Sequence, residues 1–145
     1  MTAQNTRLDQ LIAHYAVSHQ HPTNEAIHCV AVPVIMLTLL GLLYVFHPLV
    51  FALFLAASFV YYARLSIRVL VLMVIWSALL TALIVLMGDL RLPICITLFV
   101  LAWIAQFIGH KIEGRKPSFF EDLQYLWVGP LFVARVLMAR VRTIL

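Results

Sequence analysis

Histidines gather in two short stretches of this chain, where polar side chains meet long apolar runs. Three of them fall between Tyr15 and Pro33, where an apolar run begins, and a fourth lies at the end of a later run: His19, His21, His28 and His110. Imidazoles at the mouth of an apolar segment cost free energy unless something binds them. We interpret residues 15–33 as one half of a metal site and residues 106–113 as the other half.

The second stretch combines an imidazole with a carboxylate on one predicted helix. Gln106, His110 and Glu113 are four and three residues apart, so on a continuous helix they project from one face. An imidazole and a carboxylate at this spacing bind metals in helical bundles. Two or more histidines with one carboxylate and open positions suit non-haem iron(II) that activates oxygen, although zinc and manganese also fit. The predicted metal ligands are His19, His28 and His110, with Glu113 and His21 as further candidates.

Other polar residues have both a structural and a functional interpretation. Asn24 is either the N-cap of the helix that follows or a hydrogen-bonding residue beside the metal site. Gln106 lies inside an apolar run and must find a partner there. Arg64 and Arg68, one helical turn apart, either bind a carboxylate or lipid phosphate or anchor the chain at the membrane surface.

The composition is that of an integral membrane protein. Of the 145 residues, 64% are hydrophobic and 11% are charged, whereas soluble domains average roughly half apolar and a quarter charged. The mean hydropathy is +1.02. The formal charge of +4 does not indicate nucleic-acid binding, because the basic residues lie between apolar runs rather than in one patch. The expected partner is therefore the lipid bilayer and not a nucleic acid.

The apolar runs predict an all-α integral membrane protein with one membrane-embedded domain, residues 1–145. Four transmembrane helices in a bundle are expected over about 26–46, 49–63, 67–87 and 92–109. An amphipathic helix over Arg7–His19, ended by Pro22, is expected to precede them. Ser118 and Glu121 fit a capping box, and residues 123–139, broken by Gly129 and Pro130, are expected to form a re-entrant or interfacial helical segment.

The basic residues predict the orientation in the membrane. With four spans and a cytoplasmic N-terminus, every Lys and Arg except Arg91 lies on the cytoplasmic side, which is the positive-inside pattern. Both termini are expected in the cytoplasm, with the chain in the inner membrane of a bacterium or the endoplasmic reticulum of a eukaryote. Every histidine except His47 then lies at the cytoplasmic end of the bundle. His14 and His47 are interpreted as hydrogen-bonded anchors at the interface.

The two polar motifs resemble those of the yeast 2-hydroxy fatty acid dioxygenase family and its bacterial homologues. The first motif is Tyr15-x-x-x-His19-x-x-Pro22-x-Asn24-x-x-Ile27-His28 with Val32-Pro33, and the second is Gln106-x-x-Gly109-His110 followed by Glu113 and Pro117. The similarity covers nearly the whole chain. It implies an iron(II)-dependent dioxygenase of fatty acid α-oxidation, with His19, His28 and His110 assigned to iron.

The resemblance also implies a reaction. A 2-hydroxy fatty acid and O2 would give a fatty acid one carbon shorter, with loss of the carboxyl carbon. A long acyl chain would lie along the apolar helices while its carboxylate and 2-hydroxyl reach the iron. Two other functions are compatible with the residues: a haem electron carrier with two histidines as axial ligands, and a non-enzymatic membrane scaffold.

Overall fold

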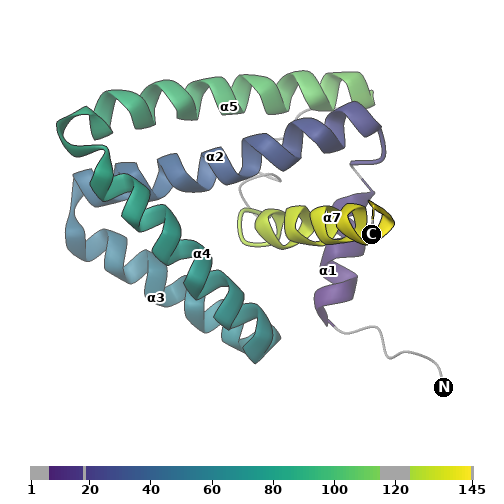
Figure 1. Ribbon diagram of the computed structural model, residues 1–145, viewed down its shortest axis with the longest axis horizontal. Helices are drawn as coiled ribbons and strands as arrows, with labels where there is room; N and C mark the ends of the chain where they lie inside the picture. The colour runs from purple at the N-terminus through teal and green to yellow at the C-terminus, as the bar shows by residue number, and fades with distance from the viewer. Residues whose placement is uncertain (1–6, 18, 115–124, 145) are drawn as a thin grey trace. The chain divides into compact units, whose positions relative to one another are not determined.

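The computed structural model describes residues 7–17, 19–114 and 125–144, with the side chains of those up to residue 139. All regular elements in these ranges are helices (Figure 1). Their bounds are α1 Arg7–Ala16, α2 Pro22–Phe46, α3 Pro48–Leu65, α4 Ile67–Leu86, the short 3-10 helix η1 Gly88–Leu90, α5 Arg91–Glu113 and α7 Gly129–Ile144. The expected all-α fold is confirmed.

Four segments are long and apolar enough to cross a membrane: α2, α3, α4 and the segment Gly88–Glu113 formed by η1 and α5. They correspond to the four predicted spans. α2 begins about one turn earlier than expected because Pro22, which has no backbone N–H to satisfy, is its first residue rather than the stop of the preceding helix. α5 continues to Glu113, about one turn beyond the predicted end. The chain is an all-α membrane protein with four membrane-length helices.

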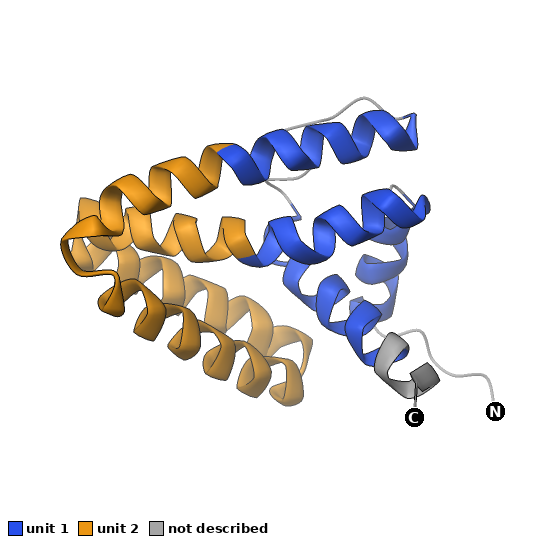
Figure 2. Cartoon of the chain, turned by 45° about the horizontal axis from the view of Figure 1, so that its top comes forward, with its two compact units in different colours: residues 1–33, 101–145 blue, residues 34–100 orange. Residues whose placement is uncertain are grey.

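Contacts between residues divide the chain into two compact units (Figure 2). Unit 1 comprises residues 1–33 and 101–145, and unit 2 comprises residues 34–100. α2 and α5 each contribute to both units without a break in the helix. The single domain expected from the sequence stays a prediction.

Short polar connections separate the helices of unit 2. His47 has an extended backbone, and its Nδ1 accepts a hydrogen bond from the N–H of Leu49 at 3.1 Å, which caps the first turn of α3. Ser66 caps α4 in the same way, with its Oγ 3.3 Å from the nitrogen of Arg68. Gly88 follows α4 with φ of +55°, a left-handed conformation that favours glycine. The turns expected at His47 and Gly88 are confirmed.

The cap at Ser66 corrects the expected relation between Arg64 and Arg68. We expected the two arginines to lie one helical turn apart. Arg64 instead lies in the last turn of α3 and Arg68 in the first turn of α4, because Ser66 has an extended backbone that breaks the helix between them. Both side chains are exposed.

Close approaches of backbone also shape unit 2. A Cβ atom on Gly41 of α2 would collide with the Sγ of Cys95 in α5, and Cys95 is fully buried. At the start of α5, Arg91 donates from its Nε to the carbonyl of Ile84 at 2.7 Å, and its guanidinium lies 4.8 Å from the ring centre of Tyr44. Arg91 therefore satisfies a carbonyl at the end of α4 that the helix leaves without an internal partner.

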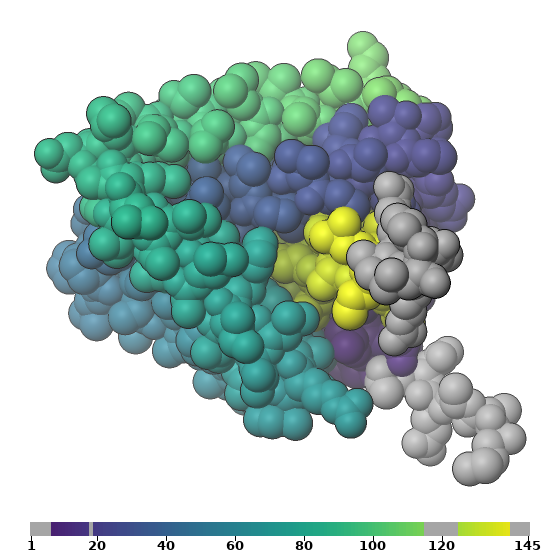
Figure 3. Space-filling model, in the orientation of Figure 1, coloured from purple at the N-terminus to yellow at the C-terminus, as the bar shows by residue number. Residues whose placement is uncertain are grey.

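In unit 1, the C-terminal helix packs against the N-terminal one. Figure 3 shows the atoms of α7 lying against those of α1. Gly129 and Pro130, expected to break a helix, are instead the first residues of α7, where proline is favoured. The apolar part of this helix, Gly129–Ala139, is too short to cross roughly 30 Å of hydrocarbon. The capping box at Ser118–Glu121 lies outside the described residues.

Candidate metal centre

α1 ends earlier than expected, and this places His19 in the connection to α2. The helix was expected to reach His19, but its last residue is Ala16. The backbone N–H groups of Gln20 and His21 donate to the two carboxylate oxygens of Glu113, at 3.0 and 2.8 Å. These hydrogen bonds replace those that a continued helix would form with its own carbonyls.

The ring of His19 is held by a carbonyl and two aromatic rings. Its Nδ1 lies 2.8 Å from the backbone oxygen of Tyr15. Because a carbonyl can only accept, Nδ1 carries the proton, and in the neutral ring Nε2 keeps its lone pair. The Tyr15 ring stacks on His19 with centroids 4.2 Å apart, and the Phe132 ring of α7 lies 5.6 Å away. Tyr15 belongs to the first motif, whereas Phe132 gave no signal in the sequence.

His28 and His110 come from α2 and α5. His28 is fully buried, and its Nδ1 lies 3.0 Å from the carbonyl oxygen of Asn24, which fixes the same tautomer as in His19. His110, close to the end of α5, is 4% exposed. The centroids of these two rings are 4.9 Å apart. The start of α2 and the end of α5 therefore present one imidazole each to the same place in unit 1.

The three rings form one cluster. The centroid of His19 lies 4.1 Å from that of His28 and 5.3 Å from that of His110. One ring nitrogen from each residue lies within 4.8 Å of the others. The three Nε2 atoms are buried and make no hydrogen bond with the residues that the structure describes. Ring nitrogens gathered this closely can bind one cation together.

This donor set fits a divalent transition metal. Imidazole nitrogen binds iron, zinc, copper and nickel. A histidine that binds a metal usually donates its other N–H to a carbonyl or carboxylate, and His19 and His28 do this through Nδ1. The three residues therefore fit iron(II), and they fit zinc as well.

Glu113, a further candidate ligand, is not brought into the cluster. Its two oxygens accept the N–H groups of Gln20 and His21, and Oε2 also accepts from the side-chain nitrogen of Asn24 at 3.2 Å. Within the described residues the cluster thus consists of imidazoles, without the carboxylate that we expected. The carboxylate instead ties the last residue of α5 to the segment that leads into α2.

The structure excludes the N-cap, one of the two roles considered for Asn24, and it places His21 away from the cluster. Asn24 is the third residue of α2 rather than its N-cap, and it is fully buried. A Cβ atom on Gly109 would collide with its Oδ1, so the seam between α2 and α5 requires glycine there. The cap is His21, whose Nδ1 accepts from the N–H of Thr23 at 3.2 Å and whose side chain is exposed. His21 lies outside the cluster.

The remaining predicted residues divide between the two units. Gln106 is 3% exposed and belongs to unit 1, as the histidine cluster does. Arg64 and Arg68 belong to unit 2 and lie on separate helices. His14, one of the expected anchors, is exposed on α1, and its ring lies 5.6 Å from that of Tyr125.

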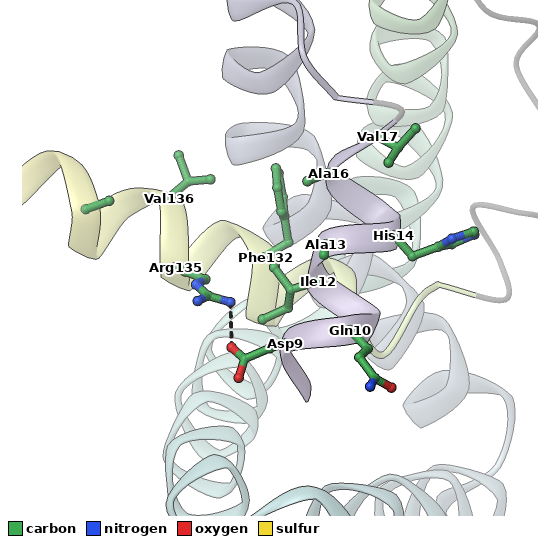
Figure 4. A pocket seen from close by; sticks show the side chains of 11 residues that line it. Asp9, Gln10, Ile12, Ala13, His14, Ala16, Val17, Phe132, Arg135 and Val136 are labelled. Carbon is green, nitrogen blue, oxygen red and sulfur yellow. Dashed lines mark hydrogen bonds and ion pairs between the residues drawn. The ribbon is translucent and has the colours of Figure 1, made fainter. Parts of the chain in front are cut away.

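A groove with a volume of about 810 Å³ lies between α1 and α7 (Figure 4). Most of its lining is apolar, and it also includes Asp9 and Arg135, which form an ion pair at 3.0 Å. Phe132 lines the groove, and its ring also faces that of His19. The groove and the cluster therefore share one side chain, although none of the three clustered histidines lines the groove.

One of three comparisons with known proteins agrees with the motifs. Neither the comparison with curated proteins nor that with solved structures gives a match. A family model described as 2-hydroxy-palmitic acid dioxygenase Mpo1-like matches residues 5–141, a range that contains both histidine motifs. The resemblance drawn from those motifs is confirmed, and the chain belongs to the Mpo1-like family.

Proposed function

We propose that this chain is an iron(II)-dependent dioxygenase that shortens a 2-hydroxy fatty acid by one carbon. The family description names a 2-hydroxy-palmitic acid dioxygenase. A dioxygenase needs a group that activates oxygen, and His19, His28 and His110 are the cluster of metal donors within the described residues. The convergence of these three buried imidazoles carries the proposal.

His19, His28 and His110 would hold the iron. Iron(II) supplies the activation of O2 and a Lewis acid for the hydroxy acid. The carbonyls of Tyr15 and Asn24 keep the protons of His19 and His28 on Nδ1, so that Nε2 can bind a metal without first losing a proton. The stacked ring of Tyr15 restricts the rotation of His19. The chain thus orients two of its three donors before the metal arrives.

The surroundings of the cluster suit a lipid substrate. All three rings are at most 4% exposed, and this burial keeps bulk water away from the reacting groups. His28 lies near the start of α2 and His110 near the end of α5, so both stand toward the ends of membrane-length helices. A long acyl chain in the bilayer can therefore stay in apolar surroundings while its polar head reaches the imidazoles.

The proposed orientation follows from the basic residues. Four crossings between His28 and His110 bring the start of α2 and the end of α5 to the same membrane face. The positive-inside pattern assigns that face, and both termini, to the cytoplasm. Cysteine substitution and labelling with a membrane-impermeant reagent from either side would test this assignment at Gln10 and Asp89, two exposed positions expected on opposite faces.

The test of the function combines metal content with product analysis. Protein purified in detergent without oxygen and without a histidine tag is analysed by mass spectrometry for metals, then given 2-hydroxypalmitic acid and O2. We expect about one iron per chain and a fatty acid one carbon shorter. A strong visible haem band would support the electron carrier instead. No bound metal after iron(II) is offered, or iron without product, would overturn the proposal.

A further inference from the structure

Gln106 is a buried polar residue that the metal cluster does not explain. It lies on α5 within the segment long and apolar enough to cross a membrane, and it is 3% exposed. Its Oε1 is buried and has no hydrogen-bond partner among the described residues. A carbonyl oxygen without a donor costs free energy in an apolar span, where water is not at hand to satisfy it. Such an atom indicates a ligand that brings its own donor.

The helical register places Gln106 next to the cluster. It precedes His110 by four residues on α5, so the two side chains lie on one face of the helix, one turn apart. On α2, Asn24 lies against Gly109, and the two helices run in opposite directions along this seam. His28 lies one turn after Asn24 on α2. Gln106 lies about one turn before Gly109 on α5, and therefore at about the same height along the seam as His28. The amide thus borders the cluster on the side of the membrane interior.

We propose that Gln106 Oε1 accepts a hydrogen bond from the 2-hydroxyl of a bound 2-hydroxy fatty acid and so selects this class over unsubstituted fatty acids. This inference rests on the proposed function. An ionised 2-hydroxy fatty acid has one hydrogen-bond donor, its hydroxyl, because its carboxylate only accepts and its acyl chain does neither. An acceptor beside the metal donors therefore distinguishes the hydroxy acid from the acid without a hydroxyl, which leaves Oε1 without a partner.

The test compares two ligands with two proteins. Dissociation constants for 2-hydroxypalmitic acid and palmitic acid are measured without oxygen on iron(II)-loaded wild type and on Gln106→Met. Methionine keeps the unbranched shape and removes both the oxygen and the nitrogen of the amide. We expect the preference of the wild type for the hydroxy acid to fall roughly tenfold in the variant, with the affinity for palmitic acid unchanged. The comparison isolates the contribution of the amide from that of the metal.

Thermal unfolding separates this role from a structural one. Because Oε1 has no partner within the described residues, Gln106→Met should leave the melting temperature of the ligand-free protein unchanged or raise it. The matched control is Thr38→Val, a similar change at a fully buried position whose hydroxyl donates to the carbonyl of Val34 at 2.8 Å. It should leave the ligand preference as in the wild type. Gln106→Leu serves if the methionine variant does not fold.

The outcomes separate a failure of the role proposed for Gln106 from a failure of the proposed function. An unchanged preference in a folded Gln106 variant would overturn the role of Gln106 and leave the proposed function standing. A wild type that binds neither acid, or binds both equally, would count against the proposed function itself. A loss of preference with a large drop in melting temperature, shared by Thr38→Val, would show a structural effect and overturn the inference.

Discussion

The side-chain nitrogen of Asn24 lies 3.2 Å from Glu113 Oε2, so the first turn of α2 is hydrogen-bonded to the last residue of α5. The same carboxylate accepts the N–H groups of Gln20 and His21. His19 directly precedes this hydrogen-bonded segment, and His110 lies one turn before Glu113. The carboxylate therefore holds together the chain segments that carry the histidines, and it does so without being one of the clustered donors.

Replacing Glu113 by Gln tests this positioning role. The amide keeps one acceptor oxygen and loses the charge, so at least one of three charge-assisted hydrogen bonds is lost. We expect a lower melting temperature, equivalent to roughly 1–3 kcal/mol, with iron still bound at about one per chain. Thermal unfolding in detergent and metal analysis measure the two effects.

The control for this substitution is Asp89→Asn, which removes an exposed carboxylate from η1 in unit 2. It should change neither the stability nor the metal content. If Glu113→Gln lost its iron at an unchanged melting temperature, Glu113 would have to be reassigned as a ligand.

His21 and His47 each cap a helix that begins with a proline, and replacing either histidine should lower the stability of the protein. His21 and His47 each accept a backbone N–H two residues later, at 3.2 and 3.1 Å, and each precedes a proline that opens a helix. We expect His21→Ala and His47→Ala to lower stability by about 1 kcal/mol each, as for other lost N-caps. Both variants should keep iron and turnover. Loss of iron in His21→Ala alone would return His21 to the set of ligands.

The fold was largely predictable because the apolar runs are long and their boundaries are local. His47 with Pro48 and Gly88 end or begin helices through their own backbone and side-chain chemistry, so the sequence indicates them directly. The two interpretations of Asn24 could not be separated in the sequence, because an N-cap and a buried residue between two helices have the same local signature. Only the approach of α5, through Gly109, distinguishes the two.

The metal-donor residues of the candidate site could be predicted from the sequence, whereas the residues that hold them in place could not. Four expected spans would place His28 and His110 at one membrane face, and the convergence of the histidines was predicted on that basis. The contact between the rings of Phe132 and His19 depends on how α7 packs on α1, and the spacing of residues in the sequence does not indicate this packing. The expected metal role of Glu113 rested on helical spacing, which could not show the hydrogen bonds that its carboxylate accepts from a distant segment.

Gly109→Ala tests the seam between α2 and α5. The added Cβ would collide with Asn24 Oδ1, and Asn24 holds the His28 ring through its own carbonyl. We expect a loss of stability of roughly 1–3 kcal/mol and an iron affinity about tenfold lower. The control is Gly129→Ala, where the nearest atom is Val32 Cγ1 at 3.2 Å, the end of a side chain that can shift. Equal effects of the two alanines would contradict the assigned contact.

Substitution of the clustered histidines is the most direct test of the site. We expect His19→Ala, His28→Ala and His110→Ala each to reduce turnover roughly 100-fold or more, because each removes one of three nitrogens within 4.8 Å. His47→Ala, which changes a histidine of unit 2, should retain turnover. A ligand that binds only the folded state raises its stability, so added iron(II) should raise the melting temperature of the wild type and not that of the three variants. A folded variant that keeps full turnover and the iron(II)-dependent shift would exclude that residue from the site.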